Sequence, residues 1–550
     1  MQTPAQTNLS SDYYWDNYQF VLRYIKKHYK NLLIEPEIEF LNQFDLLSKS
    51  AQCLYLRLCS RSTTWFQTHK ISYPEIDSLL DALQELIDIQ FLQRYSADTI
   101  LPELLHVLKK EICLEIAHQL FPDQKISKSL AKPNLVDLLS NQPHLGLISG
   151  DDFIQPTNKS YYLFTTFLFF GSRHRDLTEF VVRDLGHRQF VDVSEEDLIP
   201  YFASRKEIEQ KWQLSLWREW FWEIKEQPDS VTSIMASFEA NVLPMISDLT
   251  DLVIPAFEKM LFQVGRHLER NLQLEHALNI YAYASSINSL ERRVRLLAKL
   301  KRTDEAIYWA EFGLEYIENP AEIHFFQDFL AKQASKKHIK KVTSSLKDAE
   351  LIEIDISWQG NVEQGVVDYF QKQGYYATFS ENRIWKNILG LLTWDLLFKE
   401  KKSGYHHPFQ YAPSHYGQLE FAALSQQDFA SRLEILDDAD QALVFMQGVG
   451  ERQQGILNPL VDWYSLDWEF MENAIRVIDP KALRSVLTYM WNHLATHAKG
   501  YPDLFIEKNG IYCFIEVKSP NDHLSAIQYF WHDYFRQIDI PFRLIRVQWK

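Results

Sequence analysis

Two carboxylates and a lysine near the end of the chain have the types and the spacing that divalent-cation chemistry needs. Asp503 directly follows Pro502, Glu516 lies 13 positions further on, and Lys518 follows two positions later. Hard cations such as Mg²⁺ are held by one or two carboxylates together with water and phosphate oxygens. A neighbouring lysine can position a water molecule and offset negative charge on a phosphate. The three residues therefore predict a cation site suited to chemistry at a phosphate group.

A predicted hairpin brings the two acids together. Asn509 and Gly510 stand between alternating apolar residues, which is the pattern of a type I′ turn, because both turn positions need a positive φ. With this turn Asp503 lies opposite Glu516, at a position where like charges repel. Lys518 projects from the same strand face as Glu516. A bound cation explains the pairing; the alternatives are a solvated hairpin face, or a longer loop that shifts the register.

The residues after Lys518 predict elements that support this hairpin. Residues 519–522 break the strand, residues 524–537 have helical periodicity, and residues 542–547 form a further strand. A strand, a helix and a strand in this order favour a right-handed parallel crossover. Gln528, one helical turn before Trp531, can then point back toward the cation site, with an ordinary polar surface position as the alternative.

The composition indicates a multidomain globular protein rich in helices. With 550 residues, of which 46% are hydrophobic, the chain is long enough for three or four domains. Its longest apolar run, residues 161–170, is shorter than the ~20 residues of a membrane span, so we expect a soluble intracellular protein with no membrane partner. The net charge of −16 argues against indiscriminate coating of nucleic acid but allows local basic surfaces. The four cysteines lack metal-ligand spacing and are expected to be buried thiols.

The N-terminal residues predict a small helical domain. Residues 45–66 and 73–89 have helical spacing, and residues 91–95 form a possible short strand, an order that resembles winged-helix domains. Arg57 and Arg61 lie four positions apart, on one side of the first of these helices.

A second pair of short helices is expected between residues 100 and 145. The break between them lies at Pro133, with Lys128 at the joint and Asn134 as the expected cap of the second helix. This pattern resembles a SAP-type DNA-binding motif, and simple helix packing is the alternative.

Residues 225–345 are helical throughout, and residues 275–284 are echoed by residues 304–313. Ala277 and Ala306 occupy matching places, where small side chains let paired helices approach closely. We predict a helical-hairpin array similar to tetratricopeptide repeats, with a plain helical bundle as the alternative. Past residue 360 we expect Ser380 to cap a helix over residues 381–398, before strands become frequent. Domain boundaries are expected near residues 95, 225 and 355.

The acidic pair and the lysine resemble the PD-(D/E)xK nuclease signature, and the residues around them narrow the resemblance. Glu516 to Ser525, followed by Gln528 and Trp531, is similar to the VRR-NUC domain of the Fanconi-associated nuclease family. Glu381 and the segment GLLTWDLLF, residues 390–398, are similar to that family's acidic residue and helix. Upstream, LYLRL at residues 54–58, with Arg61 and Trp65, is similar to its N-terminal region.

The resemblance implies a mostly helical, multidomain architecture. Residues 1–95 would form a helical, winged-helix-like DNA-binding domain, 96–225 a SAP-like DNA-binding region, 226–355 a tetratricopeptide-like region, and 356–550 an α/β PD-(D/E)xK VRR-NUC nuclease domain. The implied activity is structure-selective cleavage of branched or flapped double-stranded DNA near 5′ flaps, with 5′ to 3′ exonuclease trimming, in repair of interstrand cross-links.

The resemblance also implies roles for individual residues. Asp503, Glu516 and the backbone carbonyl of Val517 would bind Mg²⁺ or Mn²⁺, Lys518 would help to activate the attacking water, and Gln528 would assist it. Glu381 would make room for a second ion. We expect DNA phosphates to be held by residues of the N-terminal regions: Arg57, Arg61 and Lys128.

Two departures from the animal members indicate a compact bacterial-type protein, expected in the cytoplasm and used at the nucleoid. The chain shows no Cys/His cluster before the helical region, so we expect no zinc finger or ubiquitin-binding module. Ile527 stands where animal members carry a lysine, and residues 496–498 are not arginine-rich, which puts a dedicated 5′-phosphate pocket in doubt. The alternatives are another PD-(D/E)xK enzyme, such as a junction resolvase, and a noncatalytic DNA-binding helical scaffold.

Overall fold

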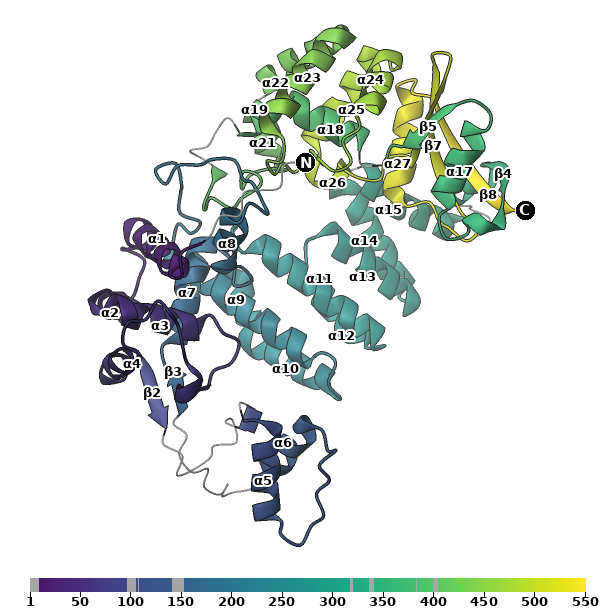
Figure 1. Cartoon of the computed structure of the whole chain (residues 1–550). Coiled ribbons are helices and arrows are strands. Elements are labelled where there is room, and N and C mark those ends of the chain that lie inside the picture. Colours follow the sequence, from purple (N-terminus) through teal and green to yellow (C-terminus); the bar gives the residue numbers. More distant parts are fainter. Residues whose placement is uncertain are drawn as a thin grey trace. The chain divides into compact units, whose positions relative to one another are not determined.

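The structure is a computed structural model that describes residues 9–95, 105–106, 108–140, 153–316, 320–335, 341–381, 383–398, 404–424 and 426–550. The chain divides into two compact units, Met1–His187 with Pro200–Ile208, and Arg188–Ile199 with Glu209–Lys550. Most of the described elements are helices (Figure 1). Within the described ranges, none of the helices has the length and hydropathy that crossing a membrane requires.

The first unit combines helices with a small antiparallel sheet in the order β1-β3-β2. Its strands are β1 (Phe66–Gln67), β2 (Leu92–Tyr95) and β3 (Phe153–Pro156). Its helices are α1 (Tyr13–His28), α2 (Glu35–Leu46), α3 (Lys49–Cys59), α4 (Leu79–Asp88), α5 (Lys110–Leu120), α6 (Lys132–Ser140), α7 (Lys159–Phe170) and α8 (Thr178–Asp184). The predicted strand before residue 95 is confirmed as β2, and the helices with the sheet form the winged-helix-like arrangement.

Two helix starts in this unit were placed wrongly by sequence. The helix expected from residue 73 begins at Leu79, because the Ser78 hydroxyl accepts a hydrogen bond from the backbone N–H of Asp81 and caps it there. Asn134 does not cap the second short helix. That helix begins at Lys132, so that Pro133 falls in its first turn, where a proline is tolerated because the N–H has no helical partner.

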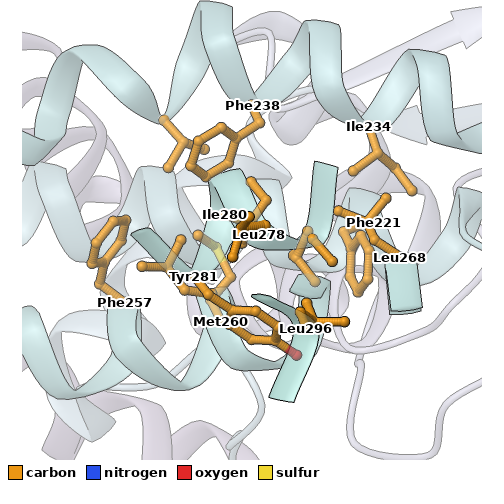
Figure 2. Close-up of a cluster of buried hydrophobic side chains, with 14 of the residues drawn as sticks. Phe221, Ile234, Phe238, Phe257, Met260, Leu268, Leu278, Ile280, Tyr281 and Leu296 are labelled. Atoms are coloured by element: carbon orange, nitrogen blue, oxygen red, sulfur yellow. The ribbon is translucent and has the colours of Figure 1, made fainter. Parts of the chain in front are cut away.

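The middle of the chain is an array of packed helices, namely α9 (Arg205–Ile224), α10 (Ser230–Asn241), α11 (Ile254–Arg270), α12 (Leu274–Ala282), α13 (Ile287–Lys299), α14 (Thr303–Tyr316) and α15 (Pro320–Ala334). The next helix, α16 (Lys341–Lys347), contacts the last strand, Phe542–Trp549. Figure 2 shows part of the core that the apolar faces of this array share, with Met260 and Tyr281 lying between Phe257 on one side and Phe221 on the other. Consecutive helices pack in pairs, α11 with α12 and α13 with α14. The predicted helical-hairpin array is thereby confirmed.

Small residues allow these helices to approach closely. Ala277 and Ala306 are fully buried, as predicted. A Cβ added to Gly265 would lie 2.4 Å from the Tyr281 ring, so α11 and α12 can touch at this point only where the side chain is absent.

A five-stranded mixed sheet follows, in the order β4-β8-β7-β6-β5. The strands are β4 (Glu350–Ile354), β5 (Tyr376–Phe379), β6 (Leu504–Lys508), β7 (Ile511–Lys518) and β8 (Phe542–Trp549). The hairpin of β6 and β7 turns at Asn509 and Gly510, whose φ angles are 55° and 80°. Leu504 pairs with Ile515, so the predicted register is confirmed. Strands β7 and β8 are parallel neighbours, and α27 (Ala526–Gln537) connects them. The predicted parallel strand–helix–strand connection is therefore confirmed.

Helices cover both faces of this sheet. α17 (Val362–Gln371) packs on the face formed by residues such as Leu504, Ile515 and Ile545. On the other face the Phe514 ring contacts Trp385 and Phe535, at ring-centroid distances of 5.4 and 5.6 Å. Side chains alternate along a strand, so Glu516 and Lys518 project on the same side as Phe514.

A helical segment separates β5 from β6. It contains α18 (Ile384–Leu392), α19 (Trp394–Phe398), α21 (Leu419–Leu424), α22 (Gln426–Leu433), α23 (Ala439–Gln453), α24 (Trp468–Val477), α25 (Pro480–Asn492) and α26 (Leu494–His497). The single helix expected over residues 381–398 is instead two helices that break at Thr393. Ser380 does not cap α18, because its hydroxyl donates to the backbone carbonyl of Pro502, at 2.8 Å.

Candidate metal centre

Asp503 is fastened to the strand that carries the other two residues of the candidate site. It stands just before β6, and its Oδ2 accepts a hydrogen bond of 2.7 Å from the backbone N–H of Val517. The backbone carbonyl of Asp503 also accepts a hydrogen bond from the Ser380 N–H, at 2.8 Å. Asp503 is therefore held from β7 on one side and from the end of β5 on the other.

Glu516 and Lys518 form a buried ion pair beside Asp503. Lys518 Nζ lies 2.7 Å from Glu516 Oε1, and the two residues are 7% and 1% exposed, against 8% for Asp503. Lys518 Nζ also donates to Gln528 Oε1 at 3.3 Å. The structure thus brings Asp503, Glu516, Lys518 and Gln528 together. Gln528 has a second task, because Ser525 and Gln528 form the capping box of α27.

The two carboxyl groups disfavour each other's ionisation. Burial is the main cause that raises the pKa of Asp503, and the nearby charge of Glu381 raises it further. Burial also raises the pKa of Glu516, followed by repulsion from Asp503. The hydrogen bond from Val517 and the charge of Lys518 act in the opposite direction on Asp503, without outweighing burial. Such a pair binds a divalent cation readily, because the ion neutralises the charge that burial penalises.

Glu381 contacts Asp503 through its backbone, and its side chain acts on the two acids through its charge. Its backbone N–H donates to the carbonyl of Asp503 at 3.3 Å, and its charge acts on both Asp503 and Glu516. The side chain is exposed and precedes α18. In the ranges that the structure describes, no three Asp, Glu, His or Cys side chains converge as a metal site.

The residues present fit a hard divalent cation. Asp503 Oδ2 accepts the hydrogen bond from Val517, which leaves Oδ1 for a ligand. Glu516 Oε1 forms an ion pair with Lys518 and has no hydrogen-bond partner among the described residues. All of these donors are carboxylate oxygens, which Mg²⁺ and Mn²⁺ prefer, and substrate phosphate oxygens commonly complete such sites.

Comparison with known families agrees with this geometry. A family model described as "FAN1, HTH domain" matches residues 12–93, and one described as "VRR-NUC domain" matches residues 439–549. The second match contains Asp503, Glu516 and Lys518. The chain carries a helix-turn-helix domain of the FAN1 type and a VRR-NUC domain. The resemblance expected from sequence is confirmed, and the candidate metal centre lies in the VRR-NUC domain.

Relatives named as Fanconi-associated nuclease 1 homologs align along nearly all of the chain. The Fanconi-associated nuclease 1 homolog of Pseudomonas aeruginosa is 24% identical over 98% of this chain and 96% of its own length. The Arabidopsis thaliana homolog is also 24% identical, and this chain spans 66% of its length. The crystal structure of paFAN1 bound to 2nt 5′ flap DNA with gap superposes with a TM-score of 0.86 over 99% of both chains, at 23% identity, which shows a shared fold.

The predicted DNA-contacting residues lie far from the VRR-NUC domain in sequence and differ among themselves. Arg57 is engaged inside its own domain, where it donates to Glu75 at 2.8 Å and covers the Tyr14 ring at 4.0 Å. Arg61 and Lys128 are exposed, and neither has an ion-pair partner in the described residues. Arg57 has a clear structural task, whereas Arg61 and Lys128 are available to a ligand.

Sequence reasoning missed two residues near the VRR-NUC centre. Ser380 holds the Pro502-Asp503 backbone, and Glu363, in the first turn of α17, adds to the negative charge that Asp503 experiences. Ser380 had a visible signal, its position before Glu381, which was read as a helix cap. Glu363 had none, because a glutamate in a first helical turn is common.

Proposed function

We propose that this protein is a metal-dependent nuclease that hydrolyses phosphodiester bonds of branched or flapped double-stranded DNA, and that it cuts near 5′ flaps and trims 5′ to 3′. The observation that carries the proposal is the buried cluster of Asp503, Glu516 and Lys518 at the start of β6 and the end of β7. Two carboxylates held together are suited to bind a divalent cation, and such a cation together with the lysine would offset negative charge on a phosphate in the transition state.

In this proposal Asp503, Glu516 and the backbone carbonyl of Val517 hold Mg²⁺ or Mn²⁺. The bound ion acts as a Lewis acid toward the phosphate and lowers the pKa of water. Lys518 places its ammonium group beside the reacting phosphate and helps to activate the attacking water, while Gln528, 3.3 Å from Lys518 Nζ, keeps that group in position. Glu381 would supply an oxygen to a second ion.

The DNA substrate is proposed from the relatives and from the exposed cations. The two neighbouring structures hold 5′ flap DNA with a gap, one with a 2nt and the other with a 1nt flap. Arg61 and Lys128 would contact phosphates, which position a duplex without specifying its sequence. We further propose a role in interstrand cross-link repair, in the cytoplasm at the nucleoid, because the relatives are Fanconi-associated nucleases.

The test is a cleavage assay on end-labelled 5′ flaps, four-way junctions and blunt duplexes, each with Mg²⁺, Mn²⁺ or EDTA. We expect cutting near the flap, dependent on the metal and absent in Asp503→Asn. The matched control is Asp533→Asn, an acid on α27 that lies outside the centre. Symmetric nicking of four-way junctions alone would indicate a junction resolvase. Cleavage retained by Asp503→Asn would remove the site assignment.

The second ion is tested by Mn²⁺ calorimetry with a noncleavable flap, in which the scissile phosphate carries a phosphorothioate. We expect two ions in the wild type and one in Glu381→Gln. In the cleavage assay on the ordinary 5′ flap, this variant should show weaker but detectable cutting. The acid Glu353, exposed on β4, gives the control Glu353→Gln. Equal stoichiometry in Glu381→Gln and wild type would restrict the centre to Asp503 and Glu516.

A further inference from the structure

Helix α14 buries its small residues and exposes its large ones. Ala306, Ala310 and Gly313 are buried, and a Cβ at Gly313 would lie 2.9 Å from the Phe326 ring of α15. On the opposite side Tyr308, Phe312 and Tyr316 are 59%, 37% and 66% exposed. The three lie four positions apart, so they form one row along the helix, about 12 Å long at 1.5 Å per residue. We call Tyr308, Phe312 and Tyr316 the α14 aromatic row.

The rings of the α14 aromatic row contact a further ring, that of the partly buried Trp309. Trp309 lies 5.2 Å from Tyr308 and 5.3 Å from Phe312, and Phe312 lies 4.5 Å from Tyr316, between ring centroids. Arg293 of α13 stands over the Trp309 ring at 3.7 Å. The aromatic surface is therefore braced from below before any partner arrives, which limits the conformational entropy lost on docking.

Apart from Arg293, which lies over the Trp309 ring, the exposed charges of α14 beside the row are negative. Helical periodicity places Asp304, Glu311 and Glu315 along one flank of it. All three are exposed, and none has an ion-pair partner in the part of the chain that the structure describes. Arg302, the nearest cation in sequence, is occupied by Glu305, at 2.6 Å. A phosphate backbone would be repelled here, whereas a cationic partner would be attracted.

We propose that the α14 aromatic row and its acidic flank form a docking surface for a basic amphipathic helix of a partner protein. Apolar side chains of that helix, spaced one turn apart, would cover Tyr308, Phe312 and Tyr316. Its lysines and arginines would face Asp304, Glu311 and Glu315 and lie over exposed ring faces. Contiguous exposed apolar surface of this kind is a feature of interaction sites, whereas singly scattered exposed rings are not. The site is separate from the VRR-NUC centre and does not depend on nuclease activity.

The test uses the full chain and a fluorescent 18-residue peptide of leucine and lysine at helical spacing, read by fluorescence anisotropy. A peptide with glutamate in place of lysine is the matched ligand control. We expect saturable binding of the basic peptide alone. The variant Tyr308→Ser/Phe312→Ser/Tyr316→Ser keeps the net charge and should bind at least tenfold more weakly. The control Tyr411→Ser/Tyr464→Ser removes two other exposed rings and should bind as the wild type does.

A second variant, Glu311→Lys/Glu315→Lys, keeps every ring and tests the charge independently of folding. It should also bind at least tenfold more weakly, and its circular dichroism and thermal unfolding should match the wild type. Equal peptide affinity in the wild type and in both variants would overturn the proposal. It would also be overturned if the serine variant lost affinity for duplex DNA instead, or if sedimentation showed a wild-type dimer that this variant dissociates, since a second copy would then cover the row.

Discussion

The Oδ2 atom of Asp503 accepts a hydrogen bond of 2.7 Å from the backbone N–H of Val517, the residue between Glu516 and Lys518. Backbone pairing between β6 and β7 ends at Leu504 and Ile515, and Asp503 directly precedes β6. The side-chain bond of Asp503 therefore extends the contact between the two strands beyond their last backbone pair. The protein's own hydrogen bonds therefore hold Asp503 beside the strand that carries Glu516. The arrangement is preorganised for the ion and unfavourable without it, which makes the centre a place where stability and activity conflict.

The first prediction concerns the buried charge of Glu516. Glu516→Gln should abolish cleavage but raise the free energy of unfolding of the metal-free protein by about 1 kcal/mol or more at pH 8. Burial raises the pKa of Glu516 from 4.5 to about 8, so the wild type loses stability as the pH rises between these two values, and the gain from glutamine should be much smaller at pH 5 than at pH 8. Urea unfolding in EDTA at both pH values measures it. Glu353→Gln should show neither effect, and a less stable Glu516→Gln at pH 8 would contradict the argument.

The second prediction separates the two tasks of Gln528. Gln528→Ala removes the acceptor of Lys518 Nζ and should slow cleavage about 10–100-fold, in the range known for groups that orient metal-site residues. It should also cost about 1 kcal/mol of stability through loss of the capping box. Ser525→Ala loses the same cap but keeps the contact with Lys518. If both variants lose activity equally, capping of α27 and not the position of Lys518 would explain the effect.

The third prediction concerns Gly500, which packs against the helix that carries Gln528. Gly500 has a φ of +77°, and a Cβ there would lie 2.7 Å from Ile527 Cγ2. Gly510 has a φ of +80° with nothing within 4 Å of its Cβ position. Gly510→Ala should therefore cost about 1–2 kcal/mol from the backbone alone, and Gly500→Ala should cost more. Chemical denaturation of both variants checks this. Adding Ile527→Ala to Gly500→Ala should recover only the part of the stability loss by which Gly500→Ala exceeds Gly510→Ala. Equal losses of stability in Gly500→Ala and Gly510→Ala would exclude the close contact.

The fourth prediction is a loss of stability in acid that arises from His497. Burial, and to a smaller extent repulsion from His493, lowers the pKa of His497 to about 4. Its Nε2 has no hydrogen-bond partner, and its ring lies among Tyr489, Phe530 and Trp531. The unfolded chain binds a proton near pH 6.5 whereas the folded protein does not, so stability should fall as the pH drops from about 6.5 toward 4.

Thermal unfolding between pH 7.5 and 5 measures this dependence on His497. His497→Leu should flatten the pH profile, and His523→Gln, at an exposed histidine, should leave it as in the wild type. A profile equally steep in His497→Leu would assign the acid sensitivity to other groups.

The hairpin was predictable because its determinants are local. Asn509 and Gly510 provide the two positive φ values of the turn, and the position of the turn fixes which residues pair across the hairpin. Phe505 then pairs with Phe514, and Glu516 lies on the same strand face as Phe514. The predicted helix start at Ser380 and Glu381 was wrong because the contact that fixes this backbone comes from a distant part of the chain. Ser380 bonds to Pro502, 122 positions away, and this overrides the capping tendency that its neighbours suggest.

Arg57 shows the same limit at a candidate binding residue. Its spacing from Arg61 indicated a basic helix side, yet Arg57 is paired with Glu75 and packed on Tyr14, neither of which is a helical neighbour. Charge patterns along one element cannot reveal a partner from another, so Arg61 and Lys128 remain the better candidates for phosphate contacts.

The bonds from Ser380 to Pro502 and Asp503 fasten both ends of the helical segment between β5 and β6. The entropic cost of closing such a segment grows only with the logarithm of its length, by about 0.6 kcal/mol per doubling. Insertions and deletions among its surface turns can therefore accumulate over evolution while the two anchor points stay in register. Homologous proteins should vary in length between these anchors and hardly at all within the hairpin.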